Sequence, residues 1–241
     1  MSGILYIVPT PVGNMDDMTP RAVEVLKSVD RILAEDTRTS APLLHRFGVT
    51  TPISSHHKYN EHDTAETVAR QISDGMNIAL ISDAGTPGIS DPGFMLSRAC
   101  AAIGVEVITL PGPTAFVPAL VDSALPCDRF AFEGFLPPQK GRATRIAEIA
   151  ARTVTTIIYE SPKRLVKTLE QLAAACGSDR PASVSREISK LHETTIRGNI
   201  GDLVEYFTTN PPRGEIVIVI GGNRDDSKPK VHRNKYRDCE D

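Results

Sequence analysis

The chain has 241 residues, of which 40% are hydrophobic, and 27 Lys and Arg stand against 30 Asp and Glu. This balance excludes a disordered chain and a small disulfide-stabilised protein, and the net charge of -3 excludes a basic field over the whole surface. The four Cys residues form no C-x-x-C pair and no apolar run reaches the roughly 18 residues of a membrane span, so we expect a cytoplasmic protein that holds no metal and enters no membrane.

The first part of the chain alternates short β-branched runs with segments of helical periodicity. Strands are predicted at residues 5–8, 31–34, 78–82 and 106–110. Helices are predicted between them at residues 19–28, 40–47, 64–73 and 93–102. This alternation is typical of an α/β protein with a largely parallel sheet, and it predicts one α/β domain over residues 1–113.

A second series of elements follows the segment Pro111-Gly112-Pro113. A helix is expected at 114–123, and further helices at 142–151, 162–176 and 200–207. Strands are expected at 130–132, 155–159, 182–185 and 215–220. Residues 114–224 are therefore predicted to form a second α/β domain. Residues 225–241 are polar and basic without apolar periodicity, which is typical of a flexible tail.

Three predicted strands of the first domain end in loops rich in Gly and Pro, at residues 9–14, 82–88 and 111–114. The carboxyl ends of parallel strands share one edge of a sheet, so these loops are expected to converge on one crevice. Any one loop reads equally well as a tight turn; three together favour a binding site. Asp83 suits a hydrogen bond from a ligand amine or hydroxyl, and suits equally the capping of its own turn.

The chain carries neither a phosphate-binding P-loop motif nor a dinucleotide fingerprint after its first strand. A small zwitterionic or nucleoside ligand therefore fits the predicted crevice better than a nucleoside triphosphate or a dinucleotide. Metal binding is not indicated either, because the His residues at 56, 57 and 62 lack the spacing of a metal-binding pair on one helix face.

Taken together in chain order, several segments resemble a known family. The segments are 5–14, 34–38 (Ala-Glu-Asp-Thr-Arg), 82–87 (Ser-Asp-Ala-Gly-Thr-Pro), 91–93, 110–113, 133–137 and 159–162 (Tyr-Glu-Ser-Pro). With their spacing, they resemble the RNA-directed branch of the tetrapyrrole methylase-like superfamily from residue 5 to about 221. Members usually continue for several tens of residues into a small helical region, whereas this sequence stops at Asp241, so we expect RNA affinity to differ from the family pattern.

The resemblance implies two α/β domains with S-adenosylmethionine in the cleft between them, and a homodimer. It further implies transfer of a methyl group to the ribose 2′-hydroxyl of a cytidine in 16S rRNA of the 30S subunit, with no DNA partner. Cofactor binding carries over to matching positions, which are Pro9, Asp83, Ala84, Gly85, Thr86, Pro87, Pro111, Gly112, Pro113, Thr114 and Tyr159. The alternatives are a methylase of the same fold that acts on a small tetrapyrrole, and a ribosome-binding protein that no longer methylates.

A ribose hydroxyl is a weak acid, so its attack on a methyl group is helped by a carboxylate or by a lysine with a lowered pKa. The catalytic candidates at family positions are Glu35, Glu160 and Lys190. Further carboxylates at such positions are Asp36, Glu133, Glu187 and Glu193. Each of these groups is also suited to an ion pair that fixes a loop.

Although the net charge of the chain is negative, one segment is basic enough to bind the RNA that the resemblance implies. Residues 137–167 carry seven Lys and Arg against two Glu, which indicates a phosphate-binding patch or, equally, a solvated helix face. The residues assigned to RNA are Arg38, His57, Arg142, Arg145, Lys163 and Arg164.

Overall fold

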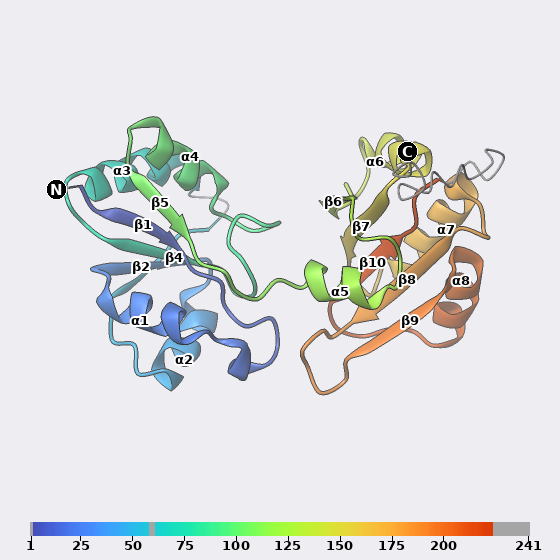
Figure 1. Ribbon diagram of the computed structural model, residues 1–241, viewed down its shortest axis with the longest axis horizontal. Coiled ribbons are helices and arrows are strands. Elements are labelled where there is room, and N and C mark those ends of the chain that lie inside the picture. The colour runs from blue at the N-terminus through green and yellow to red at the C-terminus, as the bar shows by residue number, and fades with distance from the viewer. Residues whose placement is uncertain (1, 58–60, 224–241) are drawn as a thin grey trace, which may run out of the picture.

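The computed structural model describes residues 2–57 and 61–223, and the predicted tail at 225–241 lies outside the described residues. It contains two five-stranded sheets, which lie next to each other along the long axis of the molecule (Figure 1). We refer to residues 2–113 as the N-terminal half and to residues 114–223 as the C-terminal half.

The sheet of the N-terminal half is entirely parallel, in the order β3-β2-β4-β1-β5. Its strands are β1 (Ile4–Ile7), β2 (Arg31–Ala34), β3 (Ile53–Ser55), β4 (Ile78–Ile81) and β5 (Glu106–Thr109). Its helices are α1 (Pro20–Ser28), α2 (Thr37–Arg46), α3 (Glu61–Ser73) and α4 (Phe94–Ala102), with a short 3-10 turn η1 (Met15–Asp17) before α1. Figure 1 shows α1 and α2 on one face of the sheet and α3 and α4 on the other.

Alternating side chains of the strands form the core on both faces of this sheet. In β1, Leu5 and Ile7 pack with the α3 and α4 side, whereas Tyr6 packs with the α1 and α2 side. Successive residues of a strand point to opposite faces, so a strand covered on both sides is apolar throughout. Helix α1 begins where predicted, because Thr19 accepts a hydrogen bond from the Ala22 N–H and Pro20 occupies the first turn.

The sheet of the C-terminal half is mixed, in the order β6-β7-β10-β8-β9. Its strands are β6 (Phe130–Phe135), β7 (Thr155–Glu160), β8 (Pro181–Arg186), β9 (Thr194–Asn199) and β10 (Ile216–Ile220). Only β6 and β7 are parallel; β10 pairs antiparallel with both β7 and β8, and β9 pairs antiparallel with β8. The expectation of a largely parallel sheet therefore holds for the N-terminal half and is wrong for this one.

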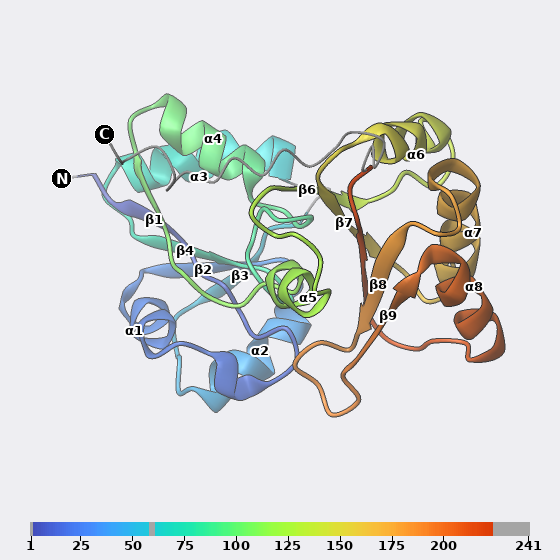
Figure 2. The ribbon, with the colours of Figure 1, turned by 45° about the vertical axis from the view of Figure 1, so that its right-hand side comes forward.

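The two faces of the second sheet are covered differently. Helices α6 (Arg142–Ala151), α7 (Leu165–Cys176) and α8 (Ile200–Thr209) cover the face that receives Ile218 of β10. The short helix α5 (Phe116–Asp122) covers the other face, which receives Val217 and Val219. Helix α5 directly follows the connection from β5 and stands between the two sheets in Figure 2. Among the described residues, no helix is long and apolar enough to cross a bilayer.

Candidate active site

A cavity of about 410 Å³ lies where the two halves meet. From the N-terminal half it is lined by residues that follow β1, β2, β4 and β5. From the C-terminal half it is lined by the ends of β6 and β7, by a residue that follows β8, and by the start of β10. The polar and charged lining residues are Glu35, Asp83, Thr86, Ser90, Asp91, Thr114, Tyr159, Glu160, Ser161 and Glu215. The volume is typical of a site for a small organic ligand.

Hydrogen bonds join the three Gly- and Pro-rich loops of the N-terminal half at one edge of the sheet. Thr10 and Gly85 exchange two backbone hydrogen bonds of 2.9 Å, and the Thr86 hydroxyl donates to the Pro113 carbonyl at 3.0 Å. Gly85 has φ +79°, a conformation that a residue with a side chain rarely adopts. Together the three loops form one wall of the cavity.

Two close contacts tie this wall to the C-terminal half. A Cβ at Gly13 would lie 2.4 Å from Cγ of Lys190 and 3.0 Å from the Ile188 carbonyl oxygen, so only glycine lets the chain pass there. A Cβ at Gly134 would lie 2.8 Å from Oγ of Ser90, which itself has φ +67°. The segment that contains Ser90 therefore reaches across to the second sheet and carries Asp91 into the cavity.

The predicted cofactor residues separate into two groups. Asp83, Ala84, Gly85, Thr86, Thr114 and Tyr159 line the cavity. Pro9, Pro87, Pro111, Gly112 and Pro113 do not line it, which differs from the expectation. Pro9 instead packs on Gly112, where a Cβ would lie 2.6 Å from the proline ring, and these residues shape the loops behind the lining.

Three carboxyl groups of the N-terminal half line the cavity, and none of them forms an ion pair with a cation of the described residues. Burial, reinforced by the charge of Asp83, raises the pKa of Glu35. Burial also raises the pKa of Asp83. Asp91 shows the largest change: burial, with the nearby charge of Glu35, raises its pKa to about 7. Loss of hydration disfavours the charged form of a carboxyl group, and like charges add to that cost.

Glu160, a catalytic candidate, lies at the end of β7 in a buried network of donors. Its side chain is fully buried, and it accepts from Arg164 at 2.7 Å and from the Thr168 hydroxyl at 2.7 Å. The Ser161 N–H donates to it at 2.8 Å and Arg142 lies at 3.7 Å. With two guanidinium groups beside it, this carboxylate holds the β7–α7 connection in place.

Lys190, the third catalytic candidate, bridges two carboxylates beside the cavity. Its ammonium group donates to Glu187 at 3.0 Å and to Glu215 at 3.1 Å. Partial burial lowers its pKa, but the bonds to these two carboxylates outweigh it, so that the pKa is raised. The expectation of a lysine with a lowered pKa is therefore wrong at this position, since paired carboxylates stabilise the protonated form.

Three of the six residues assigned to RNA are engaged in contacts within the C-terminal half. Arg142 is buried and donates to Gln171, Thr168 and the Pro137 carbonyl, so the expected contact with phosphate has no exposed group to make it. Arg145 pairs with Glu148 and Glu133, and Arg164 with Glu160. Glu133 lies on β6, outside the basic run at 137–167, and it pairs with Arg145 and Arg152 of that run.

Three of the assigned residues remain at the surface or at the rim. Lys163 is exposed, and forms no ion pair with a described residue. The Arg38 side chain is 89% exposed and pairs at 2.7 Å with Asp36, the residue that caps α2. His57 follows β3, near enough to Glu35 that its charge lowers the pKa of that carboxyl. The surface formed by the assigned residues is thus less basic than the sequence suggested.

Two titratable lining residues were not predicted from the sequence as functional groups, Asp91 and Glu215. Asp91 was noted only within a family segment, although Ser-Asp-Pro-Gly after a Gly-rich loop is a signal for a second turn at the same edge. Glu215 precedes a fully apolar strand, and nothing in its spacing connects it to the first domain. Among the described residues, no three His, Cys, Asp or Glu are placed to hold a metal ion.

Comparison with known proteins gives the family. The model of the Tetrapyrrole (Corrin/Porphyrin) Methylases matches residues 4–204. Relatives named Ribosomal RNA small subunit methyltransferase I include that of Synechocystis sp., 46% identical over 98% of this chain and 85% of its own length. Those of Escherichia coli O157:H7 and Bacillus subtilis are 45% and 42% identical, over 92% and 93% of this chain and 79% and 77% of theirs.

Solved structures share the fold at low sequence identity. The cobalt precorrin-4 methyltransferase of cobalamin biosynthesis has a TM-score of 0.64 and 18% identity, and the match covers 90% of this chain and 94% of that one. The uroporphyrin-III-C-methyltransferase of Thermus thermophilus has a TM-score of 0.62 and 18% identity, covering 91% and 94%. The predicted α/β fold of the tetrapyrrole methylase type is confirmed.

Proposed function

The chain belongs to the family of ribosomal RNA small subunit methyltransferases I within the tetrapyrrole methylases, and from this membership we propose that it transfers the methyl group of S-adenosylmethionine to the ribose 2′-hydroxyl of a cytidine in 16S rRNA. We further propose that it acts in the cytoplasm as a homodimer, with domains at 1–113 and 114–224. The substrate in this proposal is the 30S subunit.

The charge of the cavity carries the proposal. Its lining includes the carboxyl groups of Glu35, Asp83 and Asp91 but no Lys, Arg or His side chain. S-adenosylmethionine bears a sulfonium and an ammonium group against one carboxylate, so its net charge is positive, and opposite charges attract more strongly where water is excluded. The residues present therefore fit a cofactor with a net positive charge.

S-adenosylmethionine, when bound, supplies an activated methyl group and departs as a neutral thioether. The chain therefore has to align the hydroxyl with that methyl group and to take up the proton of the hydroxyl. Asp83, Gly85 and Thr114 would hold the cofactor on the side of the first sheet. Tyr159, whose pKa burial raises to about 12, stays neutral and forms the opposite wall.

Asp91 and Glu35 are the carboxyl groups suited to receive the proton. Both line the cavity and both have raised pKa values, with Asp91 near 7. A general base is most effective when its pKa lies close to the working pH. Glu160 and Lys190 are less suited, because each is already bound to groups of opposite charge.

Labelled methyl transfer tests the proposal. Purified 30S subunits that lack the modification are incubated with the protein and labelled S-adenosylmethionine, and the label is mapped by resistance of the ribose linkage to alkaline cleavage. We expect label at a single cytidine 2′-hydroxyl. Label on a base, or on a uroporphyrinogen-type compound in place of the subunit, would overturn the proposal, as would cofactor binding without any transfer.

A further inference from the structure

A second cavity, of about 280 Å³, lies in the C-terminal half outside the candidate active site. It is formed by the end of β8, the start of β9, the last turn of α8 and the segment that leads to β10. Its lining residues are Arg186, Thr194, Ile196, Tyr206, Phe207 and the segment 210–213.

Two guanidinium groups give this cavity its charge. Arg186 is half-buried, and its Nε donates to the Thr194 hydroxyl at 2.8 Å, which fixes the side chain while its terminal nitrogens remain available. Arg213 is exposed, and neither arginine forms an ion pair with a carboxylate of the described residues. No Asp or Glu lines the cavity. A guanidinium group binds phosphate in a bidentate manner, so the pair is suited to a phosphodiester.

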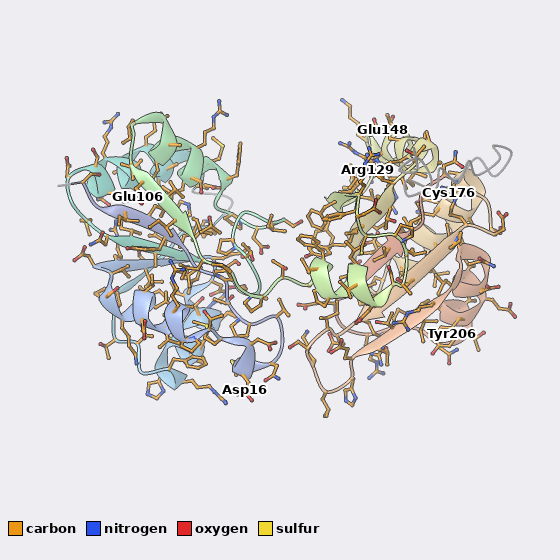
Figure 3. All side chains as sticks on the ribbon, viewed as in Figure 1. Asp16, Glu106, Arg129, Glu148, Cys176 and Tyr206 are labelled. Atoms are coloured by element: carbon orange, nitrogen blue, oxygen red, sulfur yellow. The ribbon has the colours of Figure 1, made fainter. Side chains whose placement is uncertain are left out.

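An aromatic ring lies beside the two arginines. Tyr206, labelled on α8 in Figure 3, is 42% exposed, while Phe207 beside it is buried. The two rings meet edge to face with centroids 5.0 Å apart, which holds the tyrosine ring in place. A fixed, exposed aromatic ring next to a basic group is the arrangement on which unpaired nucleobases stack.

Consecutive residues connect this cavity with the active site. Residues 211–213 line the basic cavity, while 214–217 line the active site. At the end of β8, Arg186 lines one and Ile188 the other. Neighbouring Cα atoms are about 3.8 Å apart, so the linings of the two cavities adjoin at residues 213 and 214. A single strand of RNA with one ribose in the active site would therefore need only a few nucleotides to reach the basic cavity.

We propose that this cavity, with Arg186, Arg213 and Tyr206, binds single-stranded RNA that flanks the target nucleotide. The arginines would hold a phosphodiester and Tyr206 would stack on a base. The inference rests on the proposed function, because it takes the active site as the place of the target ribose. It also assigns RNA binding to residues away from the basic run at 137–167.

The test compares Arg213→Gln and Tyr206→Ala with the unaltered chain. The KM for unmethylated 30S subunits should rise about fivefold for Arg213→Gln and about tenfold for Tyr206→Ala, while kcat and the affinity for S-adenosylmethionine stay within twofold. For a single-stranded oligoribonucleotide of the target sequence, loss of the one phosphate contact should reduce the slope of log affinity against log salt by about 0.7.

Two controls separate binding from folding. Tyr206→Phe keeps the ring and should retain the original KM. Arg98→Gln removes an exposed arginine of α4 that lines neither cavity, and it should leave KM and salt slope unchanged. Results for Arg213→Gln and Tyr206→Ala that equal those for Arg98→Gln would overturn the inference. A loss of affinity for subunits but not for the oligoribonucleotide would also overturn it, since the cavity would then bind a ribosomal protein.

The experiment distinguishes a failure of the proposed methyl transfer from a failure of the proposed RNA site. If the unaltered chain binds the oligoribonucleotide but transfers no methyl group to it or to subunits, that function is wrong. The salt slope of Arg213→Gln still decides the RNA site in that case, because it is measured without turnover.

Discussion

Both halves of the protein place carboxyl groups around one cavity, but those of the C-terminal half form ion pairs and those of the N-terminal half form none with a described residue. On the N-terminal side, Glu35, Asp83 and Asp91 face the cavity without an ion pair among the described residues, and their pKa values are raised. On the C-terminal side, Glu160 is held by Arg142 and Arg164, and Lys190 holds Glu187 and Glu215.

Because of this difference, the paired carboxylates can act only as structural contacts, whereas the unpaired carboxyl groups are free to take part in chemistry. A paired carboxylate gives up its capacity to take a proton at neutral pH, but it fixes the loop that carries it. An unpaired carboxyl group in a partly buried cavity destabilises the folded protein, and its raised pKa makes it useful as a base. The paired groups thus stabilise the wall, and under the proposed function the unpaired groups are available to the cofactor and the reaction.

Removal of the charge of Glu160 tests the structural side and should have the largest effect. Glu160→Gln leaves the guanidinium of Arg142 buried without its partner, and we expect the free energy of unfolding to fall by about 3 to 5 kcal/mol in urea titrations. Glu148→Gln is the control, because Glu148, labelled in Figure 3, pairs with Arg145 at the surface and should cost less than about 1 kcal/mol. Equal losses in the two variants would contradict the comparison.

Asp91→Asn tests the chemical side. If Asp91 takes the proton of the hydroxyl, turnover should fall about a hundredfold, or ~3 kcal/mol in activation free energy, while the affinity for S-adenosylmethionine changes less than threefold. Steady-state kinetics and calorimetry measure the two quantities. Glu35→Gln is the matched variant: a hundredfold loss there, with near-normal turnover in Asp91→Asn, would move the base to Glu35.

The pH dependence of turnover, measured for the unaltered protein and for Asp91→Asn, is a second test of Asp91 as the base. Turnover of the unaltered protein should rise through about pH 7, where Asp91 ionises, and Asp91→Asn should lack this rise. Glu35, Asp83, Glu215 and Tyr159 are the other titratable groups that face it.

The pH dependence of the free energy of unfolding is an independent test of the raised pKa of Asp91. A carboxyl group whose pKa is raised stabilises the fold while protonated, and this contribution is lost as the pH rises from the unfolded value of 3.8 through about 7. At pH 8, Asp91→Asn should therefore be more stable than the unaltered protein by about 1 to 2 kcal/mol, and the two should be equal near pH 4. Parallel curves over this range would show that Asp91 ionises normally.

Asp83→Asn tests the attraction between the unpaired carboxyl groups and a cationic ligand. Affinity for S-adenosylmethionine should fall about fivefold to tenfold, or ~1 kcal/mol, by calorimetry. S-adenosylhomocysteine lacks the sulfonium charge, so its affinity should change less. The same loss for both compounds would mean that Asp83 acts through its loop and not through its charge.

Lys190→Met should have the smallest effect. Its raised pKa keeps the ammonium group charged at neutral pH, so it cannot serve as the base, and turnover should stay within about threefold. The partly exposed pairs it forms should be worth about 0 to 1 kcal/mol in thermal unfolding. A loss of turnover comparable with that of Asp91→Asn would return Lys190 to the catalytic candidates.

The amino-acid sequence by itself determined most of the secondary structure and the place of the candidate site. Hydrophobic periodicity predicted the long elements, and the Gly and Pro loops at 9–14, 82–88 and 111–114 indicated a shared edge, because these are local properties of the chain. It did not reveal β3 or β9: β3 has only three residues, and β9 is a largely polar edge strand. Nor did it give the direction of β10, since an apolar run fits either direction.

Only the tertiary structure decided which charged groups are paired. Arg142 and Glu160 are 18 positions apart and Glu133 lies outside the basic run that it neutralises, so their meeting depends on how β6, β7 and α6 pack. The same packing leaves Asp91 without a cation among the described residues. Burial and distance between side chains set a pKa, and both belong to the folded chain rather than to spacing along it.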